Sequence, residues 1–203
     1  MSIIDFSLVR LWADLSKMSI SSHVYKAEGI ILKRCSVGEA DRILTVFSRQ
    51  YGKMRVLAKG VRRITSRRAG HLEVFTHVTL TIHLSRTLDM VTEASAIRNG
   101  SLFDSDAVRL GYAYCMCELV DQLLADHQEH EDVFFLLRDG LMGLLTTDTQ
   151  EAYQNNLRNF VHELLWRLGF LPQARRVSDD NIQVFVERIT ERHLRTWPLP
   201  LSS

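Results

Sequence analysis

Between residues 24 and 96, apolar and polar positions alternate in short runs that are rich in β-branched and aromatic residues. The alternation is clearest over 74–84, where one face of an extended chain carries Val78, Leu80, Ile82 and Leu84. The glycines that separate the runs are Gly38, Gly52, Gly60 and Gly70. The pattern predicts five strands, within 25–34, 42–48, 53–60, 74–84 and 88–95. Five short strands in so small a segment are typical of a closed or partly open barrel such as the OB-fold.

After the Asn99-Gly100 turn, the apolar spacing changes from two to three and four, which predicts helices. One apolar stripe runs from Tyr112 to Leu124 and another from Leu157 to Leu168, with a largely buried helix over 134–145 between them. A last amphipathic helix is expected to open at 178–180, to carry Ile182 through His193 on one face, and to stop near Pro198. The predicted fold class is therefore α+β: an N-terminal OB-fold β-barrel followed by an all-helical domain.

Three segments are expected along the chain. Residues 1–22 form an N-terminal extension that is peripheral or disordered, 23–99 an OB-fold nucleic-acid-binding domain, and 100–203 a helical domain. No apolar run reaches the roughly 18 residues of a membrane-spanning helix, and the N-terminus does not have the pattern of a signal peptide. Three cysteines without a CxxC pair indicate a reduced, cytoplasmic setting.

Charge is distributed very unevenly along a chain whose net charge is only +1. Residues 1–41 are neutral, 42–72 hold nine Lys or Arg and no Asp or Glu, and 73–203 hold 11 basic and 19 acidic residues. A run of like charges is destabilised by mutual repulsion unless a bound anion offsets it. The basic segment therefore predicts a surface that binds along a phosphate backbone. The alternative is a solvated surface that acidic residues of the helical half offset.

The candidate DNA-binding residues are the basic side chains of the predicted strands and of the loop after them. On the strand from Lys53 to Lys59, odd positions share a face, so Lys53, Arg55 and Lys59 are expected to line up. No aromatic RNA-binding pattern or helix-turn-helix is present, so binding is expected to be mainly to backbone. The full candidate set is Lys33, Arg34, Arg42, Arg49, Lys53, Arg55, Lys59, Arg62, Arg63, Arg67 and Arg68.

Enzyme chemistry has weak support. Glu39 and Asp41 lie beside Arg42 on a predicted turn, and 126–132 is dense in His, Asp and Glu, with His127 and His130 three apart. We expect a polar connector at 126–132, a buried Cys115, and no catalytic residue, metal or cofactor. A metal-dependent nuclease that uses these acidic or histidine residues stays open as an alternative, as does an RNA-binding OB module.

Several motifs resemble the bacterial RecO family of recombination mediators. They are EGIILKR (28–34), GEADRILTVFSRQYGKMRVLAKGVRR (38–63), SRRAGHLEVFTHV (66–78) and LDMVTEA (88–94), with looser agreement in FxLLRDGLxxLL and ELLWRLGF. The resemblance covers about residues 24–172. It implies an OB-fold joined to a helical domain and a non-enzymatic role in repair of DNA damage by recombination.

The resemblance also implies partners. Proteins of this family bind single- and double-stranded DNA and anneal complementary strands; with RecR, they help RecA onto DNA coated by the single-stranded-DNA-binding protein SSB. Many relatives carry a four-cysteine zinc motif after the helix that ends here at Gly169-Phe170. This sequence has Leu171-Pro172-Gln173 there and no cysteine beyond Cys117, so we expect no zinc site.

A dock for the acidic, apolar-ended C-terminal tail of SSB needs hydrophobic side chains with cations at the rim. The helical half offers two such places, the stretch around Trp166 and Phe170 and the final helix with its arginines. The candidate partner-binding residues are Trp166, Phe170, Arg175, Arg176, Arg188 and Arg192, with Arg195 beside them. The alternative is that the aromatics are core and the arginines are solvated.

Overall fold

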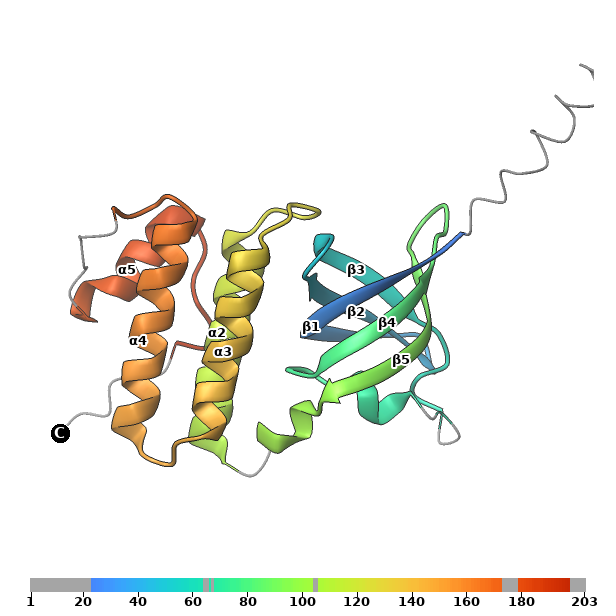
Figure 1. Ribbon diagram of the computed structural model, residues 1–203, viewed down its shortest axis with the longest axis horizontal. Helices are drawn as coiled ribbons and strands as arrows, with labels where there is room; N and C mark the ends of the chain where they lie inside the picture. Colours follow the sequence, from blue (N-terminus) through green and yellow to red (C-terminus); the bar gives the residue numbers. More distant parts are fainter. Residues whose placement is uncertain (1–22, 64–65, 67, 104–105, 173–178, 198–203) are drawn as a thin grey trace, which may run out of the picture.

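A computed structural model describes residues 23–63, 66, 68–103, 106–172 and 179–197. Within these residues, a five-stranded barrel forms one half and four α-helices form the other, with α2 and α3 next to the barrel and α4 and α5 on the far side (Figure 1). The predicted α+β class, with a barrel followed by helices, is confirmed. The predicted extension over 1–22 lies outside the described residues, and the domain boundaries stay a prediction.

The strands close into a barrel in the order β1-β2-β3-β5-β4. The strands are β1 (Val24–Val37), β2 (Asp41–Ser48), β3 (Gly52–Ala58), β4 (His77–His83) and β5 (Met90–Arg98). All neighbours pair antiparallel except β3 and β5, whose parallel register consists of the single pair Leu57↔Met90. This is the strand order of the OB-fold, and β3 meets β5 at its weakest seam.

Side-chain alternation fills the barrel as the sequence predicts. Val78, Leu80 and Ile82 of β4 are fully buried, and Met54, Val56 and Ala58 face them from β3. The expectation for Leu84 was wrong. Its side chain is 48% exposed because β4 ends one residue earlier, at His83, where the chain leaves the barrel.

Four helices follow a short 3-10 turn at Gly100–Phe103: α2 (Ala107–Leu123), α3 (Glu131–Leu145), α4 (Gln150–Arg167) and α5 (Asp179–Thr190). The Asp106 side chain caps α2 by accepting from the backbone N–H groups of Val108 and Arg109, and Thr149 caps α4. The last helix is shorter than the pattern predicts. It ends at Thr190, Glu191 has a positive φ of 52°, and His193 is exposed rather than part of the apolar face.

The barrel and the helices share one hydrophobic core at their junction. Ile30, Leu32 and Phe47 face outward from the barrel and are buried in the same cluster as the apolar faces of α2 and α3. The rings of Phe47 and Phe134 lie 5.9 Å apart between centroids. Burial of these strand residues against the helices holds the basic surface of the barrel in a fixed relation to the helical half.

The described helices were also compared with what a bilayer requires. None of them combines the length and the apolar character that a membrane span needs.

Candidate nucleic-acid interface

The predicted cationic residues divide into two groups. Five of them form ion pairs with carboxylates: Lys33, Arg34, Arg42, Arg49 and Lys53. Another five have no carboxylate partner among the described residues: Arg55, Lys59, Arg62, Arg63 and Arg68. The eleventh, Arg67, lies outside the described residues. Lys33, Arg49 and Lys53 are therefore neutralised by acids of the helical half, whereas Arg34 and Arg42 share one acid. The second group is free to meet an anion.

Lys53 belongs to the first group, although the strand places it on the same face as Arg55 and Lys59. Its side chain is 11% exposed, and its Nζ donates to the Asp121 carbonyl oxygen at 2.5 Å. The same Nζ lies 3.4 Å from a carboxylate oxygen of Asp121 and 3.4 Å from one of Asp126. Lys53 thus connects β3 to the end of α2, and it is not part of the proposed DNA surface.

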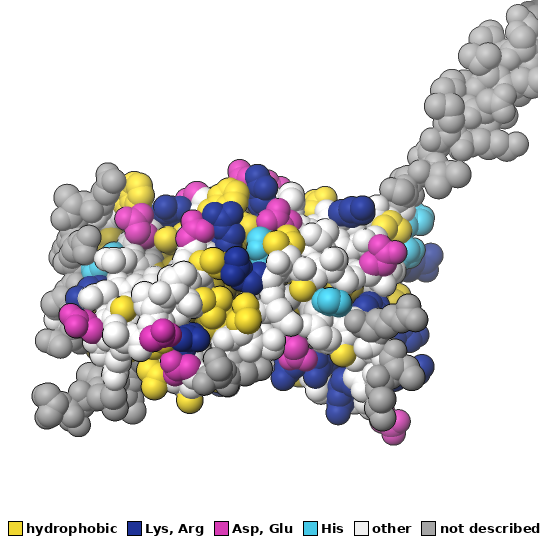
Figure 2. All heavy atoms as spheres, turned by 60° about the horizontal axis from the view of Figure 1, so that its bottom comes forward, with side chains coloured by type: hydrophobic (Ala, Val, Ile, Leu, Met, Phe, Trp, Pro, Cys, Tyr) yellow, Lys and Arg dark blue, Asp and Glu magenta, His cyan; other side chains and the backbone are white. Residues whose placement is uncertain are grey.

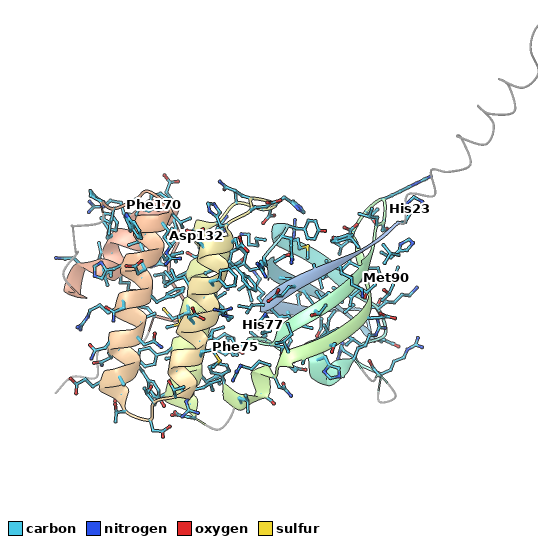
Figure 3. The ribbon with its side chains drawn as sticks, in the orientation of Figure 1. His23, Phe75, His77, Met90, Asp132 and Phe170 are labelled. Carbon is cyan, nitrogen blue, oxygen red and sulfur yellow. The ribbon has the colours of Figure 1, made fainter. Side chains whose placement is uncertain are left out.

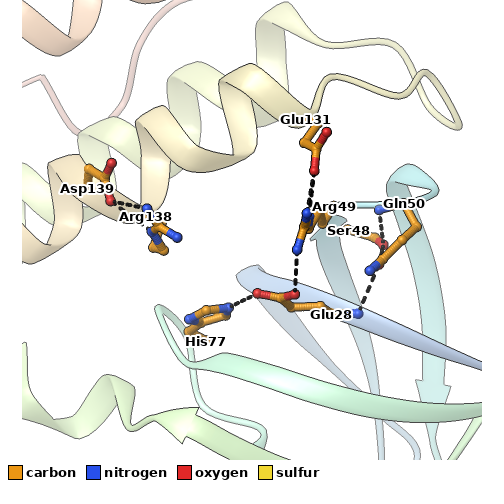
Figure 4. A network of polar contacts seen from close by, with 8 residues as sticks. All are labelled: Glu28, Ser48, Arg49, Gln50, His77, Glu131, Arg138 and Asp139. Carbon is orange, nitrogen blue, oxygen red and sulfur yellow. Dashed lines mark hydrogen bonds and ion pairs between the residues drawn. The ribbon is translucent and has the colours of Figure 1, made fainter.

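Arg49 also joins the barrel to the helices (Figure 4). Its guanidinium lies between Glu131, at the start of α3, and Glu28 of β1, at 2.6 and 3.5 Å. The hydrogen bond to Glu131 raises the pKa of Arg49 above its ordinary value. Glu28 also contacts the Nε2 atom of His77 at 2.8 Å. Lys33 makes a third connection of this kind, to Asp121 at 3.1 Å.

Arg34 and Arg42 share one carboxylate at the end of the barrel. Both guanidinium groups pair with Glu73, Arg42 at 3.0 Å. Burial lowers the pKa of Arg42, and the neighbouring charges of Arg34 and Arg62 act in the same direction. Arginine still keeps its charge near neutral pH because its ordinary pKa lies above 12. One acid between two bases leaves this end of the barrel positive.

Figure 2 shows Lys and Arg side chains over the barrel half, and three of the unpaired cations lie around one groove of the barrel. Lys59, Arg63 and Arg68 line a groove of about 630 Å³ between the end of β3 and the start of β5. Met90, which borders the groove, lies on the side of the barrel remote from α4 and α5 (Figure 3). Arg55 and Arg62 are exposed on β3 and on the turn that follows it. A groove with this charge is suited to a phosphate backbone.

Arg68 differs from its neighbours because its guanidinium bridges the seam of the barrel. Nη1 donates to the carbonyl oxygens of Val91 and Thr92 at 2.6 and 3.3 Å, and Nη2 donates to that of Lys59 at 2.8 Å. These partners are neutral, so the positive charge of Arg68 remains in the groove. The residue therefore has a structural role and an electrostatic one.

Two family models match this chain. The model described as "Recombination protein O N terminal" matches residues 18–99, and the model described as "Recombination protein O C terminal" matches residues 104–179. The chain belongs to the RecO family. The predicted resemblance is confirmed, and the N-terminal match contains the whole barrel with its groove.

Curated relatives agree with the RecO assignment. The "DNA repair protein RecO" of Roseiflexus sp. (strain RS-1) is 38% identical over 150 residues, which are 74% of this chain and 52% of the relative. Proteins of the same description from Pelotomaculum thermopropionicum and Heliobacterium modesticaldum are 33% and 36% identical, over 76% and 74% of this chain and 59% and 53% of theirs. This chain spans about half the length of the curated relatives it matches.

The residues of the nuclease alternative have structural partners. Asp41 accepts a hydrogen bond from the Gly60 backbone N–H at 2.7 Å and so ties the β1–β2 turn to the end of β3. In the connector over 126–132, Asp126 pairs with Lys53, Glu131 pairs with Arg49, and the His127 backbone N–H donates to the Lys53 carbonyl oxygen at 2.8 Å. No group of three His, Cys, Asp or Glu suited to a metal occurs among the described residues. The absence of catalysis, of cofactors and of zinc stays a prediction.

The described members of the predicted partner-binding set lie in different places, and their role stays a prediction. Trp166 and Phe170 are 37% and 41% exposed, near the end of α4 (Figure 3). Arg192 lines a different cavity with Lys33 and Arg34, between β1 and α2. Arg188 is exposed on α5, and Arg175 and Arg176 lie outside the described residues.

A second apolar pocket at the junction was not predicted from the sequence. It has a volume of about 320 Å³ and lies where β1, β4 and β5 meet α3. The residues that line it include Ile30, Phe75, Ile97, Phe103, Leu141, Met142 and Leu145, with Arg98 and Arg138 beside them. Its residues come from distant parts of the chain, so periodicity within one element gives no signal of it.

Proposed function

We propose that this chain acts as a DNA-binding mediator of DNA repair that anneals complementary strands and helps to load a recombinase on SSB-coated DNA. The observation that carries the proposal is the group of cations without carboxylate partners around the groove between β3 and β5. Release of counterions from a strand bound there supplies affinity that does not depend on sequence. The names of the RecO relatives, each a DNA repair protein, support DNA as the nucleic acid.

A binding experiment on the whole chain tests the proposal. Arg62→Ala with Arg63→Ala should weaken binding of unrelated single strands by similar factors and slow the annealing of complementary strands. Lys33→Ala is the matched control, because Lys33 is paired with Asp121 and its loss should leave affinity nearly unchanged. Equal losses in the two variants would show that the groove is not the binding surface.

The same protein and strands also test the two alternative functions, a metal-dependent nuclease and an RNA-binding module. An annealing mediator leaves strand lengths unchanged with and without magnesium, whereas a nuclease shortens them only with the metal. Competition between DNA and RNA strands of equal length tests the RNA-binding reading. Shortened strands, or a strong preference for RNA, would contradict the proposed function.

The second pocket supports a partner-binding role as well. Most of the residues that line it are apolar, and Arg98, Arg138 and Asp139 line it as well. Arg98 is exposed, and the Arg138 guanidinium lies 4.6 Å from the centroid of the Phe135 ring and pairs with Asp139. An apolar pocket with cations at its rim suits an acidic peptide that ends in apolar residues. We therefore propose that this pocket holds the SSB tail, in place of the region around Trp166 and Phe170. A RecR-like partner and RecA remain expectations from the resemblance.

Charge reversal separates the possible tail sites. Arg98→Glu should weaken tail-peptide binding several-fold while DNA binding at the groove persists. The comparison variants are Arg188→Glu on α5 and Arg175→Glu with Arg176→Glu, which should have little effect. Loss of tail binding only in one of the comparison variants would move the tail site to that variant's region.

A further inference from the structure

The groove between β3 and β5 offers charge and hydroxyl groups to a ligand but no aromatic platform. Lys59, Arg63 and Arg68 supply the charge, and Ser66 and Thr92 supply the hydroxyl groups. The segments on both sides, KGVRRITSRRAG over 59–70 and LSRTLDMVT over 84–92, contain no Phe, Tyr or Trp. Proteins that hold single strands usually stack bases on aromatic rings as well as binding phosphates.

The aromatic rings of the described barrel are occupied elsewhere. Phe47 and Phe75 are buried against the helices. Tyr25 and Tyr51 pack on each other with centroids 4.9 Å apart, and the Tyr25 hydroxyl donates to Asp89 at 3.0 Å. Tyr51 is 40% exposed, but it lies on the β2–β3 turn and is not among the residues that line the groove. No described Phe, Tyr or Trp lines the groove.

We propose that the groove holds a nucleic-acid strand by its phosphates alone and leaves the bases exposed. The inference rests on the proposed function and specifies its ligand: a phosphodiester backbone, with bases and their identity irrelevant to affinity. A strand held in this way keeps its Watson–Crick edges free for a second strand. Annealing then follows from the way the groove binds, because no base has to leave a protein ring before it pairs.

A strand without bases provides the direct test. Oligo(dT) and an abasic strand of equal length and backbone are compared with the full chain at one salt concentration. The affinities should agree within about threefold, because stacking on aromatic rings contributes about 5- to 150-fold per base and the groove has no such ring. A loss of tenfold or more on the abasic strand overturns the inference while the proposed DNA binding stands. Failure of both strands to bind overturns the proposed function itself.

A variant shows whether both strands use the groove. Lys59→Ala with Arg63→Ala removes two exposed cations and should lower the affinity for oligo(dT) and for the abasic strand by the same factor. A loss confined to oligo(dT) would mean that bases contribute at this site and would contradict the inference.

The exposure of bases is measured separately with permanganate, which oxidises unstacked thymines. In saturated complexes with oligo(dT), thymine reactivity should stay within about twofold of that of the free strand. Strong protection of thymines along the bound segment would show that the bases face the protein and would overturn the inference even if the affinities agree.

Discussion

The guanidinium group of Arg68 lies between two strands that share one backbone pairing. β3 and β5 meet only at Leu57↔Met90, and beyond that point Arg68 connects the Lys59 carbonyl to those of Val91 and Thr92. A planar group with donors on both sides bridges the strands in a way that a lysine ammonium, a point charge, does not reproduce. The barrel is therefore closed at its weakest seam by a side chain.

Arg68→Ala should lower the free energy of unfolding by about 1–3 kcal/mol, because hydrogen bonds from a charged donor are lost at a partly exposed site. Arg63→Ala is the matched control, since Arg63 is exposed in the same groove and should weaken DNA binding without changing stability. Urea denaturation of both variants checks this. Equal stability of the two variants would contradict the structural role of Arg68.

Gly52 combines a positive φ with a crowded position. Its φ is 66°, and an added Cβ would lie against the backbone of Gln128, closer than van der Waals contact allows. Gly38 has a similar φ of 56° but nothing within 4 Å of an added Cβ.

Gly38→Ala should lower the free energy of unfolding by about 1–2 kcal/mol, from the left-handed backbone alone. Gly52→Ala should cost about 1–3 kcal/mol more, because the connector must move. Thermal denaturation measures the difference, and equal costs would show that the connector does not press on Gly52.

The sequence locates the cations but not the acids that neutralise them. Lys33, Arg49 and Lys53 pair with Asp121, Asp126 or Glu131, which lie between 68 and 88 positions further along the chain. Local spacing contains no information on such contacts, so the predicted DNA surface included residues that hold the molecule together. The exposure of Arg55, Lys59, Arg62 and Arg63 was predictable, because strand alternation and the turn after β3 place these side chains outward. Their contact with DNA stays a proposal.

At the scale of elements, the β2–β3 hairpin docks on the connector between α2 and α3. Backbone contacts accompany the ion pairs, since the His127 N–H donates to the Lys53 carbonyl. Lys53→Ala removes a partner from two carboxylates, of which Asp121 is only 22% exposed and keeps its ion pair with Lys33. We expect a loss of about 2–3 kcal/mol, below the ~3–5 kcal/mol of a fully buried pair because Asp126 is half exposed.

The matched control for Lys53 is Lys59, which directly follows the end of β3 and is exposed. Lys59→Ala should leave the free energy of unfolding unchanged and reduce DNA affinity. Lys53→Ala should lower the free energy of unfolding and leave the DNA affinity of the folded protein unchanged. Denaturation curves measure the stability of both variants, and binding curves measure their DNA affinity. If Lys53→Ala weakens DNA binding of the folded protein as much as Lys59→Ala, Lys53 belongs to the DNA surface after all.

The existence and type of each predicted strand and helix are confirmed, and two ends are wrong, that of β4 at Leu84 and that of the last helix. Period-two and period-three-to-four patterns separate the barrel from the helices because each period places apolar side chains on one face. The end of α5 depends on other contacts. Glu187 accepts from the Leu194 backbone N–H at 3.1 Å, and Glu118 of α2 accepts from the backbone of Thr196 at 2.9 Å. These bonds turn the chain at Glu191, and no local pattern predicts them.

For the whole molecule, the segregated charge has two uses. Part of the basic charge on the barrel meets acids of the helical half at the junction, and part faces outward around the groove. Of the two interpretations that the sequence left open, the offset by the acidic half applies to Lys33, Arg49 and Lys53. The DNA surface stays a proposal for the unpaired residues around the groove. Net charge along the chain does not distinguish them, because a paired and an unpaired arginine count equally.

The salt dependence of DNA binding separates the two uses. Five unpaired cations together with Arg67 provide for about six phosphate contacts, so log affinity for single strands should fall with log salt with a slope of about −4. Arg62→Ala with Arg63→Ala should reduce the slope to about −3, because each lost contact removes about 0.7. Lys33→Ala with Arg49→Ala removes the same charge from paired positions and should leave the slope near −4, even if the junction loosens. Binding titrations over a range of salt concentrations measure all three slopes. If the two double variants reduce the slope equally, total charge governs binding, and the division of the barrel into a junction and a DNA surface is wrong.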